Sequence, residues 1–209
     1  PDLHDNQVVF TAEGDLWLHD MKSAATRRLT TNLAQEQQAV FSTDGTQIAF
    51  TASYEGATEV YVIPTAGGLA RRVTFENSYV YLQQWTRDGK LLYSTNTRVG
   101  PTGNWSLKQV DPVTLNTEEV PVADAIEGAI DEASDTLYFT QFGLQVSRDN
   151  ARYYRGGAQG ELWRYKLGSQ TEALLLTDAH DASAREPMVA GDKLYFVSNQ
   201  NGNDNLWVM

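Results

Sequence analysis

An aromatic residue recurs along the chain at a nearly fixed interval. It lies at Trp17, Tyr61, Trp105, Trp163 and Trp207, so the spacings are 44, 44, 58 and 44 residues. Short β-type segments bounded by turn residues flank these positions. A period in the low forties with four short strands per unit is typical of β-propeller blades. Helical repeats of similar length would need two long amphipathic stretches per unit, and the sequence contains none.

The second repeat, residues 38–75, shows the unit most clearly. Its turns contain Asp44-Gly45 and Gly67-Gly68, which supply the positive φ angles that tight antiparallel hairpins require. We therefore predict an all-β fold, a β-propeller in one domain. Its five four-stranded blades are expected near residues 1–31, 38–75, 81–122, 127–177 and 185–209.

The last blade has sequence for only three strands. An open ring exposes strand edges that natural propellers protect by closing the ring. We therefore expect a fragment of a larger propeller, with six blades as the predicted number and seven as the alternative. The recurring aromatic is expected to serve blade packing, although the same five residues could instead line a peptide-binding surface.

Composition narrows the classes of partner. The net charge is −11 and the sequence pI is about 4.6, which argues against nucleic acid and anionic membranes as partners. No segment approaches the roughly 20 apolar residues of a membrane span, so we expect no membrane insertion. The absence of cysteine excludes disulfides, cysteine–zinc sites and thiol catalysis.

The 58-residue interval contains an insertion, residues 143–160, within the fourth blade. Guanidinium groups bind carboxylates bidentately, and tyrosine offers rigid contact area. The insertion is therefore our candidate binding patch for carboxylates or peptide backbone, since long loops in compact domains often carry function. In the alternative interpretation the arginines pair with neighbouring acids and the tyrosines cover a blade. The candidate residues are Arg148, Arg152, Tyr153, Tyr154 and Arg155.

The sequence lacks the common motifs for serine hydrolysis, zinc-dependent proteolysis and phosphate binding. There is no Gly-x-Ser-x-Gly, His-Glu-x-x-His or phosphate-binding loop, so we expect no catalytic residue, no cofactor and no metal. An Asp-x-His-Asp pattern that could supply metal ligands occurs twice, at His4 and at His180, but we expect turn capping by aspartate beside a surface histidine instead. Asn199, Asn201 and Asp204 superficially resemble a calcium loop, but they are expected to form a hairpin turn.

The second repeat resembles the propeller repeats shared by TolB and tricorn proteases. Both of its neighbours repeat parts of it: Asp88-Gly89 follows Asp44-Gly45 by 44 residues, and Arg71-Arg72-Val73-Thr74 follows Arg27-Arg28-Leu29-Thr30 by the same interval. Two further stretches are similar to the N-terminal propeller of tricorn-type proteases in particular. They are Pro1-Asp2-Leu3-His4-Asp5 with Glu13-Gly14-Asp15-Leu16-Trp17, and Tyr154-Arg155-Gly156-Gly157 with Gly160 and Leu162-Trp163.

This resemblance implies a non-catalytic domain of a serine peptidase. In the tricorn family a six-bladed propeller precedes a seven-bladed propeller, a PDZ domain and catalytic domains, and the propellers filter and channel oligopeptides within a large homo-oligomer. The implied partners are peptides or other domains of the same polypeptide. The segment Glu76-Asn77-Ser78-Tyr79 lacks the basic residues that archaeal members have there.

The resemblance leaves two alternatives for function and two for location. The chain could be a stand-alone TolB-like protein-binding propeller, or the propeller lid of a prolyl-oligopeptidase-type enzyme. Family resemblance implies a cytoplasmic location, whereas a removed signal peptide would imply a periplasmic one.

Overall fold

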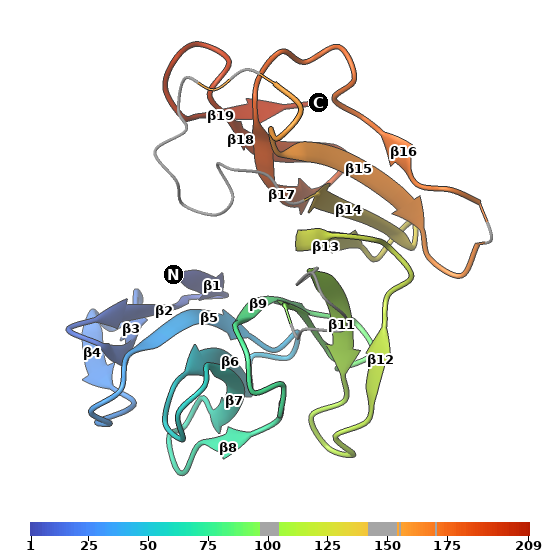
Figure 1. The fold of residues 1–209 in the computed structure, drawn as a ribbon. Coiled ribbons are helices and arrows are strands. Elements are labelled where there is room, and N and C mark those ends of the chain that lie inside the picture. The colour runs from blue at the N-terminus through green and yellow to red at the C-terminus, as the bar shows by residue number, and fades with distance from the viewer. Residues whose placement is uncertain (97–104, 142–153, 155, 170) are drawn as a thin grey trace. The chain divides into compact units, whose positions relative to one another are not determined.

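The computed structural model describes residues 1–209 apart from 97–104, 142–153, 155 and 170. The described residues form five antiparallel sheets, four with four strands and one with three, and they contain no helix (Figure 1). Strands follow one another across each sheet in sequence order. The predicted all-β propeller fold is therefore confirmed, including the three-stranded last blade.

The strand boundaries follow the repeat. The first sheet contains β1 (Asp2–His4), β2 (Gln7–Ala12), β3 (Asp15–Asp20) and β4 (Ala25–Arg28), and the second contains β5 (Glu36–Phe41), β6 (Gln47–Ala52), β7 (Glu59–Pro64) and β8 (Arg71–Arg72). The third contains β9 (Val80–Trp85), β10 (Leu91–Thr95), β11 (Ser106–Val110) and β12 (Thr117–Glu119).

The remaining strands form two sheets. The fourth sheet contains β13 (Ala125–Asp131), β14 (Thr136–Gln141), β15 (Glu161–Lys166) and β16 (Leu174–Leu175). The fifth contains β17 (Ala184–Ala190), β18 (Lys193–Ser198) and β19 (Asn205–Val208).

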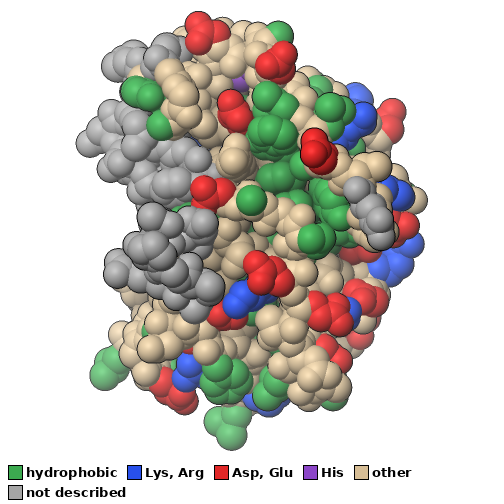
Figure 2. All heavy atoms as spheres, turned by 45° about the vertical axis from the view of Figure 1, so that its right-hand side comes forward, with side chains coloured by type: hydrophobic (Ala, Val, Ile, Leu, Met, Phe, Trp, Pro, Cys, Tyr) green, Lys and Arg blue, Asp and Glu red, His purple; other side chains and the backbone are tan. Residues whose placement is uncertain are grey.

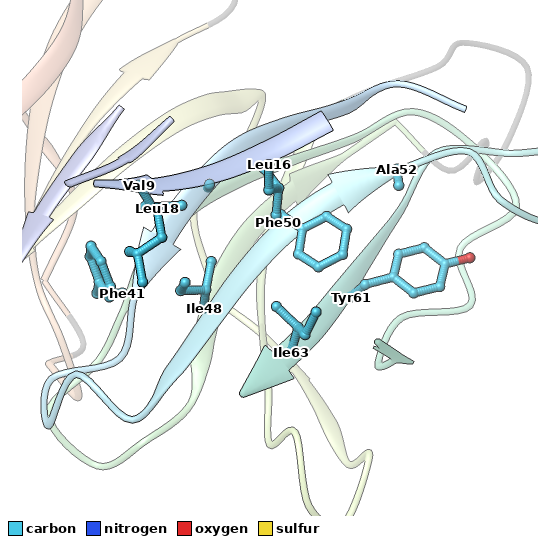
Figure 3. Close-up of a cluster of buried hydrophobic side chains, with 10 residues drawn as sticks. Val9, Leu16, Leu18, Phe41, Ile48, Phe50, Ala52, Tyr61 and Ile63 are labelled. Carbon is cyan, nitrogen blue, oxygen red and sulfur yellow. The ribbon is translucent and has the colours of Figure 1, made fainter. Parts of the chain in front are cut away.

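The chain divides into two compact units. The first comprises residues 1–103 and 108–118, and the second comprises residues 104–107 and 119–209. In the first unit a continuous apolar cluster joins the first two sheets, because alternate residues of β2 and β3 meet those of β5, β6 and β7. Figure 3 shows its labelled members: Val9, Leu16, Leu18, Phe41, Ile48, Phe50, Ala52, Tyr61 and Ile63.

The first strands of the second, fourth and fifth sheets carry β-bulges. The register shifts between Gln37 and Val40 in β5, and between Arg185 and Met188 in β17. Within these bulges Gln38 has a φ of 52° and Glu186 a φ of 54°, which are left-handed values for non-glycine residues. A bulge of this kind redirects a side chain out of the regular alternation.

Candidate functional site

The predicted binding patch lies almost entirely outside the described residues. Arg148, Arg152, Tyr153 and Arg155 belong to the segments for which no structure is described. Tyr154 is described and is 36% exposed. Its hydroxyl oxygen accepts a hydrogen bond from the Ala158 N–H at 3.3 Å, so this tyrosine folds back over the following turn. The patch as a whole remains a prediction.

Gly156 lies close to the end of the Tyr154 side chain. A Cβ atom placed there would lie 2.7 Å from the hydroxyl oxygen of Tyr154. Downstream, the Gly160 N–H donates to the Ser183 hydroxyl at 3.3 Å, and the Ala184 N–H donates to the Gly160 carbonyl at 2.8 Å. The end of the insertion is thus anchored beside the start of β17.

The recurring aromatic occupies the third position of the third strand in four sheets. Trp17, Tyr61, Trp163 and Trp207 lie opposite phenylalanines of the second strand, which are Phe10, Phe50, Phe139 and Phe196. Trp105 lies immediately before β11. Tyr61 is buried and the four tryptophans are partly buried. Ring contacts accompany this pairing in two sheets, where the Phe50 and Tyr61 centroids are 5.9 Å apart and those of Phe139 and Trp163 are 6.5 Å apart.

The polar atoms of these aromatics differ in their bonding. The Trp17 indole N–H donates to the Ala12 carbonyl at 3.1 Å, and that of Trp207 donates to the Ser198 carbonyl at 3.3 Å. Both acceptors lie two residues beyond the paired phenylalanine. The buried Tyr61 hydroxyl and the Trp163 indole nitrogen have no hydrogen-bond partner among the described residues. A buried polar group without a partner costs stability.

This difference predicts opposite effects for two tyrosines in contact, Tyr54 and Tyr61, whose ring centroids are 4.6 Å apart. Tyr61→Phe removes an unbonded buried hydroxyl, so we expect unchanged stability or a gain of about 1 kcal/mol. Tyr54→Phe removes the donor to Glu36 Oε1 at 2.5 Å and should cost about 1–3 kcal/mol. Urea unfolding of both variants measures this, and a loss of stability in Tyr61→Phe equal to that in Tyr54→Phe would contradict it.

The first arginine of the Arg-Arg repeat joins consecutive blades. Arg27 of β4 donates to the backbone carbonyls of Thr65 and Ala66, in the turn that follows β7. Arg71 of β8 donates in the same way to the Pro112 carbonyl, beyond β11. Each such arginine therefore holds the outer turn of the next sheet.

The second arginine of the repeat acts within its own blade. Arg28 pairs with Asp15, and Arg72 pairs with Glu59 at 2.8 Å. The two acids are 44 residues apart and open β3 and β7. Each arginine Nε also donates to the carbonyl two residues on, that of Thr30 or Thr74.

The threonine that closes the repeat is a hydrogen-bond relay. Its hydroxyl oxygen accepts the N–H of the second residue of the third strand in three sheets, at 2.8, 2.8 and 3.1 Å. Thr30 and Thr74 then donate to the buried carboxylates of Glu36 and Glu59. The threonines are Thr30, Thr74 and Thr177, and their donors are Leu16, Val60 and Leu162.

Buried carboxylates were not among the residues singled out from the sequence. Glu36 and Glu59 are both almost fully buried, and burial together with the Glu36 carboxylate raises the pKa of the Tyr54 hydroxyl above its ordinary value. The signal that could have found Glu59 is the recurrence of an acid two residues before the aromatic, at Asp15, Glu59 and Glu161. These carboxylates collect hydrogen bonds from both the strands and the connections between sheets.

The histidines act in packing. The His4 ring lies 5.8 Å from that of Phe41, and the Asp2 carboxylate accepts the Phe41 N–H at 2.7 Å. The expected turn capping is therefore wrong for Asp2, which instead bonds a strand of the next sheet. Among the described residues no group of three or more His, Cys, Asp or Glu side chains could hold a metal ion.

One serine–histidine contact is present in the second unit. His180 Nε2 lies 2.7 Å from the Ser198 hydroxyl oxygen. Ser198 is only 1% exposed, and the His180 ring also lies edge-on to Phe196 and Trp207. A substrate could not reach such a hydroxyl, so we interpret the contact as a packing element.

The predicted turn after β18 is confirmed. The Gly202 N–H donates to the Asn199 carbonyl at 2.9 Å and closes the hairpin. Asn199 Oδ1 accepts the Ser183 N–H, whereas Asp204 pairs with Arg185. The side-chain oxygens of Asn199 and Asp204 thus bond different parts of the fifth sheet and its approach.

Surface charges are largely interspersed. On the face in Figure 2, basic side chains lie beside acidic ones. Lys90 illustrates this, because it pairs with Glu118 at 3.1 Å and with Asp88 at 3.6 Å. In the part of the chain that the structure describes, no helix is long and apolar enough to span a membrane.

The repeated sheets and their inter-blade contacts define the class: this is a β-propeller domain. The family model described as the tricorn protease N-terminal β-propeller domain matches residues 1–209. The chain belongs to that family.

Several known proteins are similar to this chain. Tricorn protease homolog 1 of Streptomyces coelicolor is 29% identical over 99% of the chain, and tricorn protease of Thermoplasma acidophilum is 24% identical over 97%. The chain spans only 19% of the length of each. The crystal structure of the tricorn protease superposes with a TM-score of 0.80 at 22% identity, covering 100% of this chain and 21% of that one.

A more distant propeller shares the fold. TolB from Acinetobacter baumannii superposes with a TM-score of 0.65 at 14% identity, covering 96% of this chain and 51% of that one.

Proposed function

We propose that this chain is a non-catalytic substrate gate of a serine peptidase that admits oligopeptides to a catalytic centre elsewhere in the polypeptide. The observation that carries the proposal is the family match along all of residues 1–209. The relatives named as tricorn proteases are about five times as long as the chain, which leaves room for separate catalytic domains.

The contacts within the sheets support a passive role. Buried carboxylates, arginines and threonines are engaged in hydrogen bonds that hold strands and connections together. Such a rigid frame suits a domain that selects by size and shape. We extend the proposal to assembly, with the propeller supplying contact surface within a homo-oligomer.

Deleting residues 1–209 from the complete polypeptide tests the gate. We expect kcat/KM for a tetrapeptide to change little, whereas discrimination between short and long peptides should be lost. The isolated chain of 209 residues should hydrolyse neither. Equal loss of activity on every peptide would indicate a supporting role instead, and unchanged discrimination would contradict gating. Sedimentation of the two forms tests assembly separately.

A further inference from the structure

Two side chains at bulges in the first strand of a sheet connect that sheet to the next one in the same way. They are Gln38 in β5 and Glu127 in β13. In the first unit Gln38 Oε1 accepts the Leu82 N–H of β9 at 3.1 Å. In the second unit Glu127 Oε2 accepts the Glu186 N–H of β17 at 2.6 Å. Each bond joins the first strand of one sheet to the first strand of the next. A neutral amide performs this task in one unit and an ionisable carboxyl performs it in the other.

The surroundings of Glu127 disfavour its charge. Burial raises the pKa of the Glu127 carboxyl above its ordinary value of 4.5, and the nearby Glu186 carboxylate raises it further. The Glu186 N–H, the Thr140 hydroxyl and the Arg185 guanidinium lower it, but burial is the largest cause. Thr140 on β14 and Arg185 and Glu186 on β17 are thus the polar groups that face the Glu127 carboxyl. Tyr138 is the next titratable residue on β14, two residues before Thr140.

Among the described residues, the guanidinium of Arg185 is the cation that acts on Glu127, and it is engaged elsewhere. Arg185 pairs with Glu186 and, through Nη2, with Asp204 at 2.8 Å. Among the described residues, no basic side chain forms an ion pair with Glu127. The ionised carboxylate therefore relies on hydrogen bonds alone in a partly buried site, which is unfavourable for a charge.

The neighbouring threonine can bond the carboxyl in its neutral form as well as in its charged form. In the first unit the Thr51 hydroxyl donates to Gln38 Oε1 at 3.2 Å. In the second unit Thr140 lies opposite Glu127, is fully buried, and its hydroxyl oxygen has no hydrogen-bond partner among the described residues. A protonated Glu127 could donate its O–H to Thr140 while its other oxygen still accepts the Glu186 N–H.

We propose that the contact between β13 and β17 is an acid-responsive clasp, closed by the neutral form of Glu127 and loosened when Glu127 ionises. The direction of the pH effect follows from the difference in proton binding between the folded and the unfolded chain. Because the pKa of Glu127 is higher in the folded chain than in the unfolded one, folding gains stability as the pH falls through the folded pKa. That gain is lost as the pH rises from about 4.5, the ordinary pKa of the carboxyl, to its higher pKa in the folded chain.

Amide hydrogen exchange on the 209-residue chain tests the clasp, with rates corrected for the intrinsic effect of pH. Between about pH 5 and about pH 8 we expect protection of β17 to fall by about tenfold. Glu127→Gln should keep β17 protected at both pH values, because Gln38 shows that an amide fits the equivalent place.

The matched control is Gln38→Glu, which should give β9 the same pH dependence in the first unit. A carboxyl ¹³C NMR titration of Glu127 in the unmodified chain provides a second measurement that requires no variant. Titration at or below the ordinary value would overturn the proposal, as would unchanged pH dependence in Glu127→Gln.

Discussion

Glu59→Ala is expected to destabilise the first unit by about 3–5 kcal/mol, because it removes one acceptor of the partly buried Arg72 guanidinium and leaves three further donors without their carboxylate. Glu59 is 1% exposed. Its two oxygens accept from Arg72 Nη2 at 2.8 Å, Thr74 Oγ1 at 2.6 Å, and the N–H groups of Glu76 and Asn77 at 3.1 and 2.8 Å. One carboxylate thus binds both its own blade and the connection to the next.

Glu55→Ala is the matched control, because Glu55 accepts from the same guanidinium at 2.7 Å but is 65% exposed at its side chain. An exposed ion pair contributes little, so this variant should lose less than about 1 kcal/mol. Urea unfolding followed by tryptophan fluorescence measures both variants. If Glu59→Ala also lost less than about 1 kcal/mol, the buried carboxylate would not be the element that holds the connection.

The fold was predictable because the local signals agree with one another. The first blade was predicted near residues 1–31, and its strands β2 and β3 lie there because apolar alternation and the Asp5-Asn6 and Glu13-Gly14 turns specify the same hairpins. A repeat also provides a check on the prediction, because a strand assignment made in one unit must hold in the other units as well. The fold class followed from the period before any long-range contact was known.

The first strand of the second sheet was less predictable. The sequence interpretation began the second blade at residue 38, whereas β5 begins at Glu36 and passes through Gln38 with a positive φ. No local signal marks a glutamine for that conformation. Its stabilising contacts are with Thr51 and Leu82, which are 13 and 44 residues away, so tertiary structure determines the bulge.

The candidate site was partly visible and partly not. The Arg-Arg-x-Thr repeat was recognised, but sequence spacing could not reveal that Arg27 crosses to the next sheet while Arg28 turns back to Asp15. Two adjacent residues on a strand point to opposite faces, and what each face meets depends on how the blades pack. The arginines and tyrosines of the insertion, Tyr154 apart, lie outside the described residues and stay a prediction.

Gly45→Ala is expected to cost about 2–4 kcal/mol, more than the equivalent change 44 residues later. Gly45 has a φ of 69°, and a Cβ atom there would lie 2.5 Å from the ring of His4. Gly89 has a φ of 80° and nothing within 4 Å of the same atom. Gly89→Ala should therefore carry only the left-handed strain, about 1–2 kcal/mol.

The difference between the two glycines measures how β1 is held against the second sheet. The His4 ring could rotate away from a new methyl group, but it would lose its contacts with Phe41 and with the Thr43 carbonyl, which lies 3.3 Å from Nε2. In a His4→Ala background the cost of Gly45→Ala should fall to that of Gly89→Ala, and a double-mutant cycle in urea reports the coupling. Equal costs for the two glycine substitutions with His4 present would mean that the ring does not press on this turn, so that the Asp2–Phe41 bond would be the main contact of β1 with the second sheet.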